Sequence, residues 1–174
     1  METTLHSKTY VRESDALDRR PMLSGIVTGQ IAGLIMALVV MLVFSLFLGK
    51  SPLYPVQVIG SAIFGEKALR GFHSGALVAG LLLHQLGPSL LWGLVYGALA
   101  SGLRIRTAFS ALLLGLALGV FSMIGPYLLI PVLMNALHGQ DFWNREVPML
   151  WDWAAHMVFG ASFVLFPRVL NRLG

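Results

Sequence analysis

Three residues combine polar chemistry with an apolar setting. His84 and His156 each lie within a long apolar run, and Asp152 precedes His156 by four residues, which places both on one helical face. A carboxylate at that spacing can orient the imidazole of a ligating histidine. Two neutral imidazoles on facing helices can ligate the iron of a b-type haem. Gly80 and Gly160, each four residues from a histidine, would leave room for the porphyrin.

A simpler interpretation gives both histidines a structural role. Prolines inside a helix lack an N–H and displace the carbonyl four residues earlier. Such freed carbonyls need partners in an apolar setting, and neutral histidines can supply the donor. The histidines can also bond to Gln85 or Asn135. A divalent metal held by the histidines is a separate, less favoured alternative. The interrupting prolines and the carbonyls they free are Pro88 with His84, Pro126 with Ser122, and Pro131 with Tyr127.

An enzyme is the least supported interpretation. Gly87-Pro88-Ser89 and Ala155-His156 followed by Gly160 resemble, locally, the serine–histidine dyad of rhomboid intramembrane proteases. The serine motif lacks its second glycine, the spacing from histidine to glycine is one residue too long, and that family has six spans. Ser89 is also expected at a different depth from His156, too far for a hydrogen bond. We therefore predict no catalytic residues, and the chain carries no phosphate loop or metalloprotease motif.

The elements that must position these residues are helices in lipid. Of the 174 residues, 56% are hydrophobic and 11% charged, and the mean hydropathy is +0.77. Soluble domains carry about 25% charged residues because their surfaces face water. The chain has no cysteine, which excludes disulfides and thiolate metal sites. Its net charge of +4 is small and scattered, so we expect a lipid bilayer and no nucleic acid as a partner.

Charge-free runs predict an all-α bundle of four transmembrane helices. About 20 apolar residues cross a hydrocarbon core. The second span contains Pro88 and His84, and the third contains Pro126 and Pro131. The fourth contains His156 and ends at Pro167. The predicted spans are 23–48, 73–100, 107–137 and 148–166.

Two shorter segments complete the expected organisation. Residues 1–22 form a polar tail with charges of both signs, which does not match a cleaved signal. Residues 56–64 are apolar but too short to cross, so we expect a short interfacial helix between the first and second spans. Residues 23–174 then form a single transmembrane domain.

Basic residues predict the orientation. Eight Lys and Arg flank the side of the two termini, and four lie on the opposite side. Because cytoplasmic segments carry the excess of basic residues, both termini are expected in the cytoplasm. Trp143, Trp151 and Trp153 then form an outer aromatic belt.

Small residues at four-residue spacing predict where the helices pack, because close backbone approach stabilises helix contacts in lipid. The stripe of the first span has two interpretations: packing inside the bundle, or docking of another membrane subunit. The predicted packing residues are Gly25, Gly29 and Gly33, then Gly75 and Ala79 (in a stripe that starts at Gly71), then Gly115 and Gly119.

Three stretches resemble small bacterial inner-membrane proteins of unknown function, the YagU-like and related families. They are GIVTGQIAGLIMALVVMLV, LLLHQLGPSLLWGLVYGALA and AAHMVFGASFVLFP. The resemblance implies a compact, multi-pass helical bundle in a bacterial plasma membrane. It implies no activity and no site residues.

From these observations we expect a non-catalytic accessory or scaffold subunit of a larger membrane complex. The alternatives are an electron-transfer carrier of haem b or a metal through His84 and His156, and a small transporter or channel. Ion pathways commonly use buried acids or bases. The sequence shows no such residue deep in a predicted span, since Asp152 is expected near the outer surface.

Overall fold

The computed structural model describes the backbone of residues 3–173 and the side chains of residues 20–173. Everything described is helix, turn or short connection. Four helical stretches are long and apolar enough to cross a membrane: Arg20–Phe47, Ser74–Gly102, Ala108–His138 and Met149–Leu173. The elements are α1 (Thr3–Phe47), α2 (Tyr54–Phe64), η1 (Gly65–Leu69), α3 (Ser74–His84), η2 (Gln85–Ser89), α4 (Leu90–Gly102), α5 (Ala108–Ser122), η3 (Gly125–Leu129), α6 (Ile130–His138), α7 (Phe142–Glu146), α8 (Met149–Ser162), η4 (Phe163–Leu165) and α9 (Phe166–Leu173).

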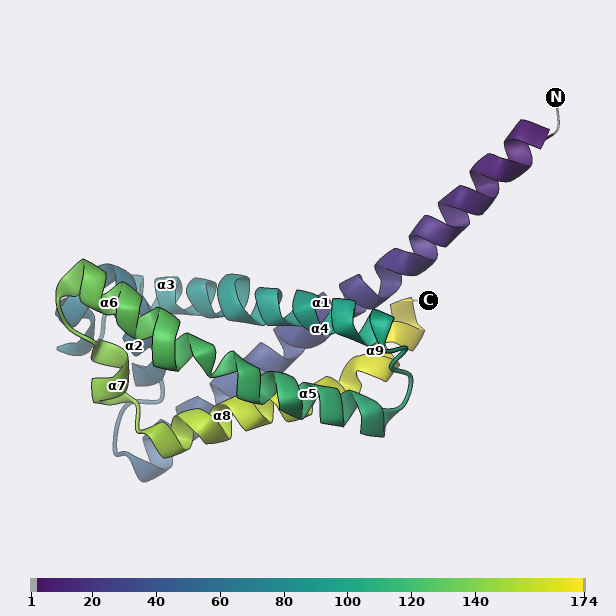
Figure 1. Cartoon of the computed structure of the whole chain (residues 1–174). Coiled ribbons are helices and arrows are strands. Elements are labelled where there is room, and N and C mark those ends of the chain that lie inside the picture. Colours follow the sequence, from purple (N-terminus) through teal and green to yellow (C-terminus); the bar gives the residue numbers. More distant parts are fainter. Residues whose placement is uncertain (1–2, 174) are drawn as a thin grey trace.

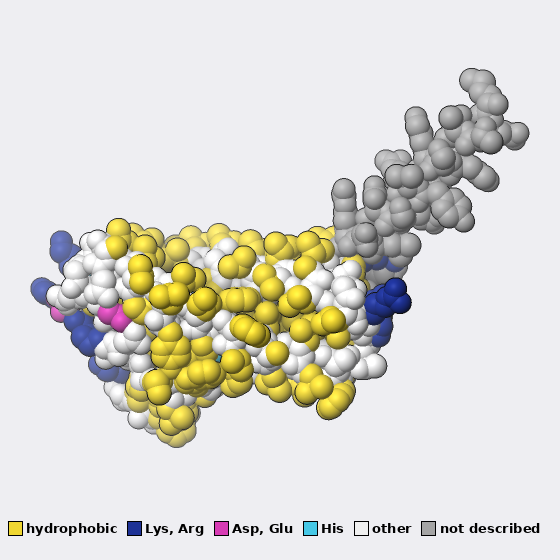
Figure 2. Space-filling model, in the orientation of Figure 1, with side chains coloured by type: hydrophobic (Ala, Val, Ile, Leu, Met, Phe, Trp, Pro, Cys, Tyr) yellow, Lys and Arg dark blue, Asp and Glu magenta, His cyan; other side chains and the backbone are white. Residues whose placement is uncertain are grey.

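The four stretches run side by side, and both chain ends lie at the same end of the bundle (Figure 1). The expected polar tail is helical from Thr3 and continuous with the first span. Hydrophobic side chains cover the middle of the molecule and charges lie at its two ends (Figure 2). We call the end near the chain termini the arginine end, after Arg20, Arg104, Arg106, Arg168 and Arg172. The opposite end, formed by α2, η1 and α7, is the cap end.

The glycine stripe of α1 lies against α4. A Cβ added at Gly29 would lie 2.6 Å from the Cα of Gly93, and one added at Gly25 would overlap the backbone of Gly93 and Gly97. At Gly33 the added carbon would meet the Ser89 hydroxyl. The face expected to receive another subunit is therefore buried within the chain.

A second glycine contact joins α5 to α8. A Cβ added at Gly119 would lie 2.6 Å from the carbonyl oxygen of His156, and Gly115 faces Gly160. The stacked rings of Tyr96 and Phe163, 4.1 Å apart, fill the space towards the arginine end. Small residues bring these helices together, and aromatic side chains complete the core beside them.

The segment expected as a short interfacial helix is α2 at the cap end, and one face of it packs closely against α3. Along α2, Val58 and Ser61 are fully buried, because Gly60 of α2 meets the backbone of Ala76 and Gly80 of α3 meets that of Val56. These contacts correct the predicted packing face of α3. Gly75 touches only the side chains of Phe64 and His73, Ala79 is partly exposed, and Ala76 and Gly80 form the helix contact.

Prolines shape the spans in three ways. Pro88 and Pro126 each lie in a π-helical turn, η2 and η3, which widens the helix where an α-helical bond is lost. Pro131 lies in the first turn of α6, where its missing N–H is tolerated. Pro167 was expected to end the fourth span, but a 3₁₀ turn precedes it and helix continues to Leu173. The fourth stretch is therefore longer than predicted.

Candidate functional site

A chain of hydrogen bonds links α5, α8 and α7 in the half of the bundle near the cap end. The Ser122 hydroxyl lies 2.6 Å from Nδ1 of His156, and Nε2 of the same ring lies 3.4 Å from Oδ1 of Asp152. The indole N–H of Trp143 donates to Oδ2 of Asp152 at 3.0 Å. Asp152 is only 5% exposed, and Ser122 2%.

The members of this chain satisfy one another. The Ser122 hydroxyl lies within hydrogen-bond distance of both the carbonyl oxygen of Gly119, at 2.7 Å, and Nδ1 of His156. The carboxylate of Asp152 has a partner at each oxygen, the ring of His156 at Oδ1 and the indole N–H of Trp143 at Oδ2. Such partners lower the cost of burying an acid in an apolar interior.

Asp152 lies in the first turn of α8, at the end of the span where it was expected, but it is not exposed there. The helix α7 folds over the start of α8 and places Trp143 on its carboxylate. The four-residue spacing does bring it to His156, in the helical geometry expected. The chain therefore buries an acid in its fourth long apolar helix, a feature that the sequence interpretation had missed.

The second polar cluster joins the π-helical turn η2 to α1. Nε2 of His84 lies 3.1 Å from the carbonyl of Gly33, and the side-chain amide of Gln30 donates to the carbonyl of Gln85 at 2.8 Å. The Ser89 hydroxyl donates to the carbonyl of His84, the group that Pro88 frees. The bond from Ser89 gives the freed carbonyl of His84 a hydrogen-bond donor in place of the one that the kink removes. Oε1 of Gln85 is buried without a partner among the described residues.

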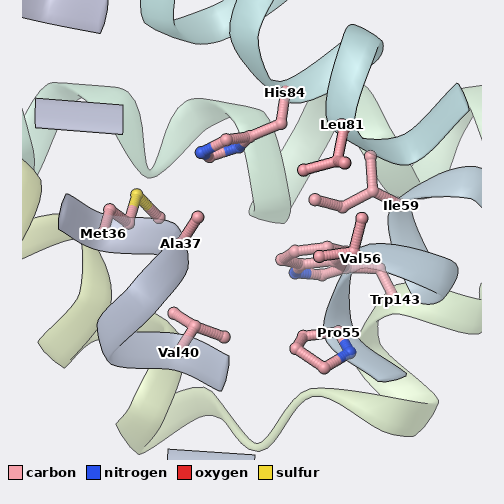
Figure 3. Close-up of a pocket in the computed structure, with 9 residues that line it drawn as sticks. All are labelled: Met36, Ala37, Val40, Pro55, Val56, Ile59, Leu81, His84 and Trp143. Carbon is pink, nitrogen blue, oxygen red and sulfur yellow. The ribbon is translucent and has the colours of Figure 1, made fainter. Parts of the chain in front are cut away.

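Neither of the two cavities in this half of the bundle borders both histidines. His84 borders a cavity of about 50 Å³ (Figure 3), far below the several hundred Å³ of ordinary ligand sites. His156 has both ring nitrogens on protein groups, Ser122 and Asp152. Among residues 20–173, no three His, Asp or Glu side chains gather as a metal would require.

The serine–histidine pair that resembled a protease dyad is not formed. Ser89 bonds to the backbone of its own span, whereas His156 bonds to Ser122. The sequence interpretation missed the hydroxyl of Ser122, although it had identified the carbonyl of this residue. A serine four positions before a proline, in a helix with small residues facing a histidine, was the available signal.

A charged network closes the cap end. The Tyr54 hydroxyl donates to Glu146 at 2.7 Å, and Arg145 lies 2.8 Å from Glu146 and 3.7 Å from Glu66. Burial, followed by the hydrogen bond to Glu146, raises the pKa of the Tyr54 phenol. Burial also acts to raise the pKa of Glu146, but the hydrogen bonds from Tyr54 and Arg145 and the charges of Arg145 and Lys50 outweigh it, so that this pKa is lowered.

The chain was compared with models of protein families, with curated proteins and with solved structures. It matches none of them.

Proposed function

We propose that the chain is a multi-pass protein of a bacterial plasma membrane, a non-catalytic accessory or scaffold subunit with both termini in the cytoplasm. The arginine end carries five arginines and no acid among the described side chains, whereas the cap end mixes both signs. That asymmetry supports the orientation, because basic residues accumulate on the cytoplasmic side.

The observation that carries the accessory role is the closed interior. The glycine faces of α1 and α5 are used within the chain, and Ser89, Ser122, His84 and His156 are all bonded to protein groups. A reactive group needs space for a substrate within reach of its atoms. Only His84 borders a cavity, which is small and apolar, so we infer that the chain acts through its surfaces.

The test is purification of the tagged full-length chain in mild detergent. We expect it to elute in a stable complex with at least one other membrane protein. Leu38→Trp and Leu42→Trp alter the exposed side of α1, and Leu150→Trp serves as the matched change at an exposed position of α8. Recovery only as a monomer or self-oligomer in every preparation contradicts the proposal.

A second candidate is a small proton-linked transporter, and buried Asp152 is the observation that favours it. Intramembrane acids commonly mark ion pathways. The test is substrate-dependent flux in liposomes that contain the purified chain alone. Asp152→Asn should abolish such flux and Asp141→Asn, at a partly exposed position of the cap end, should not. Equal flux in both variants contradicts this candidate.

A further inference from the structure

Two apolar cavities with shared walls lie between α1 and α2, in the half of the bundle near the cap end. The first, of about 50 Å³, is shown in Figure 3, where the ring of His84 and the side chains of α2 face α1 across it. The second, of about 90 Å³, lies towards α8. Four residues border both cavities: Met36, Val40, Pro55 and Trp143.

Each cavity lies beside a lipid-facing side chain. Leu81, which is 41% exposed, borders the first cavity, and exposed Ala154 borders the second. The first cavity therefore opens beside α3 and the second beside α8. Both openings lie in the apolar belt, where the surrounding solvent is hydrocarbon.

The walls indicate the chemistry of an occupant. His84 and Asp152 are the ionisable residues among those that border the cavities, and both already have protein partners. The remaining surface is aliphatic or aromatic. An apolar cavity of about 150 Å³ holds benzene. These two smaller spaces therefore fit a short part of a flexible hydrocarbon chain, and not a ring system.

Lys50 supplies a cation near the position where the head group of such a molecule would lie. Nζ of Lys50 is 4.7 Å from the centroid of the Tyr54 ring, and Tyr54 immediately precedes Pro55, which borders both cavities. Among the described residues Lys50 forms no ion pair within 4.0 Å, although its charge also acts on Glu146, whereas Arg145 is held by Glu146 and Glu66. An ammonium at the interface is suited to a phosphate.

We propose that the cavities hold an acyl chain of a phospholipid from the leaflet at the cap end, with its phosphate at Lys50. The site extends the apolar belt into the bundle and fills the space that α2 leaves between α1 and its neighbours. This inference rests on the proposed membrane residence and not on the accessory role.

Fluorescence of Trp143 tests the acyl chain directly, because this residue borders both cavities. The full-length chain with Trp92, Trp151 and Trp153 replaced by Phe is reconstituted in vesicles of phosphatidylglycerol brominated on the acyl chains. Bromine quenches an indole that it contacts. Ala37→Leu and Ala154→Leu fill the two cavities, and Ala98→Leu is the matched change on the exposed side of α4.

The combined filled variant should reduce quenching about two-fold, since it removes space of methylene size from each cavity, and Ala98→Leu should leave it unchanged. Equal quenching in the filled and control variants overturns the site. An uninserted protein would show no quenching in any variant, which separates failure of the site from failure of membrane residence. Where the leucine variants do not fold, Ala37→Val and Ala154→Val replace them.

The head group is tested on the detergent-purified chain, by counting the phosphatidylglycerol retained per protein in native mass spectra. Lys50→Gln should weaken retention about five-fold, the effect of one interfacial cation, and Lys67→Gln should not. No retained phospholipid, detergent alone in the cavities, or a dimer that the filled variants dissociate would each overturn the proposal.

Discussion

Near the arginine end the long helices meet backbone to backbone, whereas near the cap end an inserted helix separates them. In the first region Gly25 and Gly29 lie directly on Gly93 and Gly97, and the rings of Tyr96, Phe163 and Phe166 pack beside them. In the second region α2 lies against α3, and the core consists of residues from α1, α2, α6 and α7: Phe44, Val58, Met134, Phe142, Trp143 and Val147.

The difference shows how a small bundle makes room for polar groups. Direct glycine contacts leave no space between helices, so few side chains can lie between them. Where α2 is inserted, the helices diverge and leave the two cavities and the buried Asp152. Each of the following predictions tests whether the contacts described for one of the two regions stabilise it.

The largest effect is expected at the direct contact. Gly29→Ala places a methyl group 2.6 Å from the Cα of Gly93, so α1 and α4 must separate. We expect the free energy of unfolding to fall by about 3 kcal/mol, the upper range for overpacking. Unfolding in mixed micelles of increasing SDS content, followed by circular dichroism, measures it. Gly87→Ala is the control, because no atom lies near an added Cβ there. Equal stability of the two variants would show that the glycines are not in contact.

Gly80→Ala should have the next largest effect, on the inserted helix. The new methyl group overlaps the carbonyl of Val56, and we expect a loss of about 2 kcal/mol by the same measurement. Gly75→Ala is the matched control on α3, since its nearest neighbours are the flexible side chains of Phe64 and His73 at 3.1 Å or more. A larger effect at Gly75 would instead favour the packing face predicted from the sequence.

The spans were predictable because their signal is composition. Four apolar helices follow from the absence of charge over lengths that exceed a bilayer, and the structure has four such stretches. The kinks at Pro88 and Pro126 were predictable for the same local reason, since proline removes a specific bond. In both cases the evidence lies within a few turns of one helix.

Pairings between segments were not predictable. The composition of a nine-residue apolar stretch does not identify the helix that it packs against, and the contact of Gly60 with Ala76 identifies α3 as the partner of α2. Gly75 and Gly80 lie on different faces of α3, and spacing alone does not identify the face that meets a partner. Burial of Asp152 depended on Trp143, which approaches from another helix. The spacing of residue types along one segment contains no information about these contacts between segments.

An intermediate effect is expected at the buried acid. Asp152→Leu leaves the indole N–H of Trp143 and the ring of His156 without their acceptor, which should cost about 2 kcal/mol. Asp152→Asn keeps an oxygen for Trp143 and should cost less. Unfolding in SDS again provides the measurement, and Asp141→Asn is the control, because Asp141 is only partly buried and asparagine also serves as the N-cap of α7. If Asp152→Leu were more stable than Asp152→Asn, the hydrogen-bonded chain would not contribute to the stability of this region.

The smallest effect is expected in the charged network that closes the cap end. Because folding lowers the pKa of Glu146, its contribution is fully present above the unfolded value of about 4.3 and is lost as the pH falls through the lower folded value. Tyr54→Phe removes one donor to this carboxylate, so it should cost about 1 kcal/mol at pH 7 and make stability less dependent on pH below about 4.3.

Tyr127→Phe is the control, because no hydrogen bond of its hydroxyl appears among the described residues and its ring lies beside Trp153. Unfolding measured between pH 3 and pH 7 distinguishes the two variants. An unchanged pH dependence in Tyr54→Phe would mean that Arg145 alone holds Glu146, and that the link between α2 and α7 is apolar.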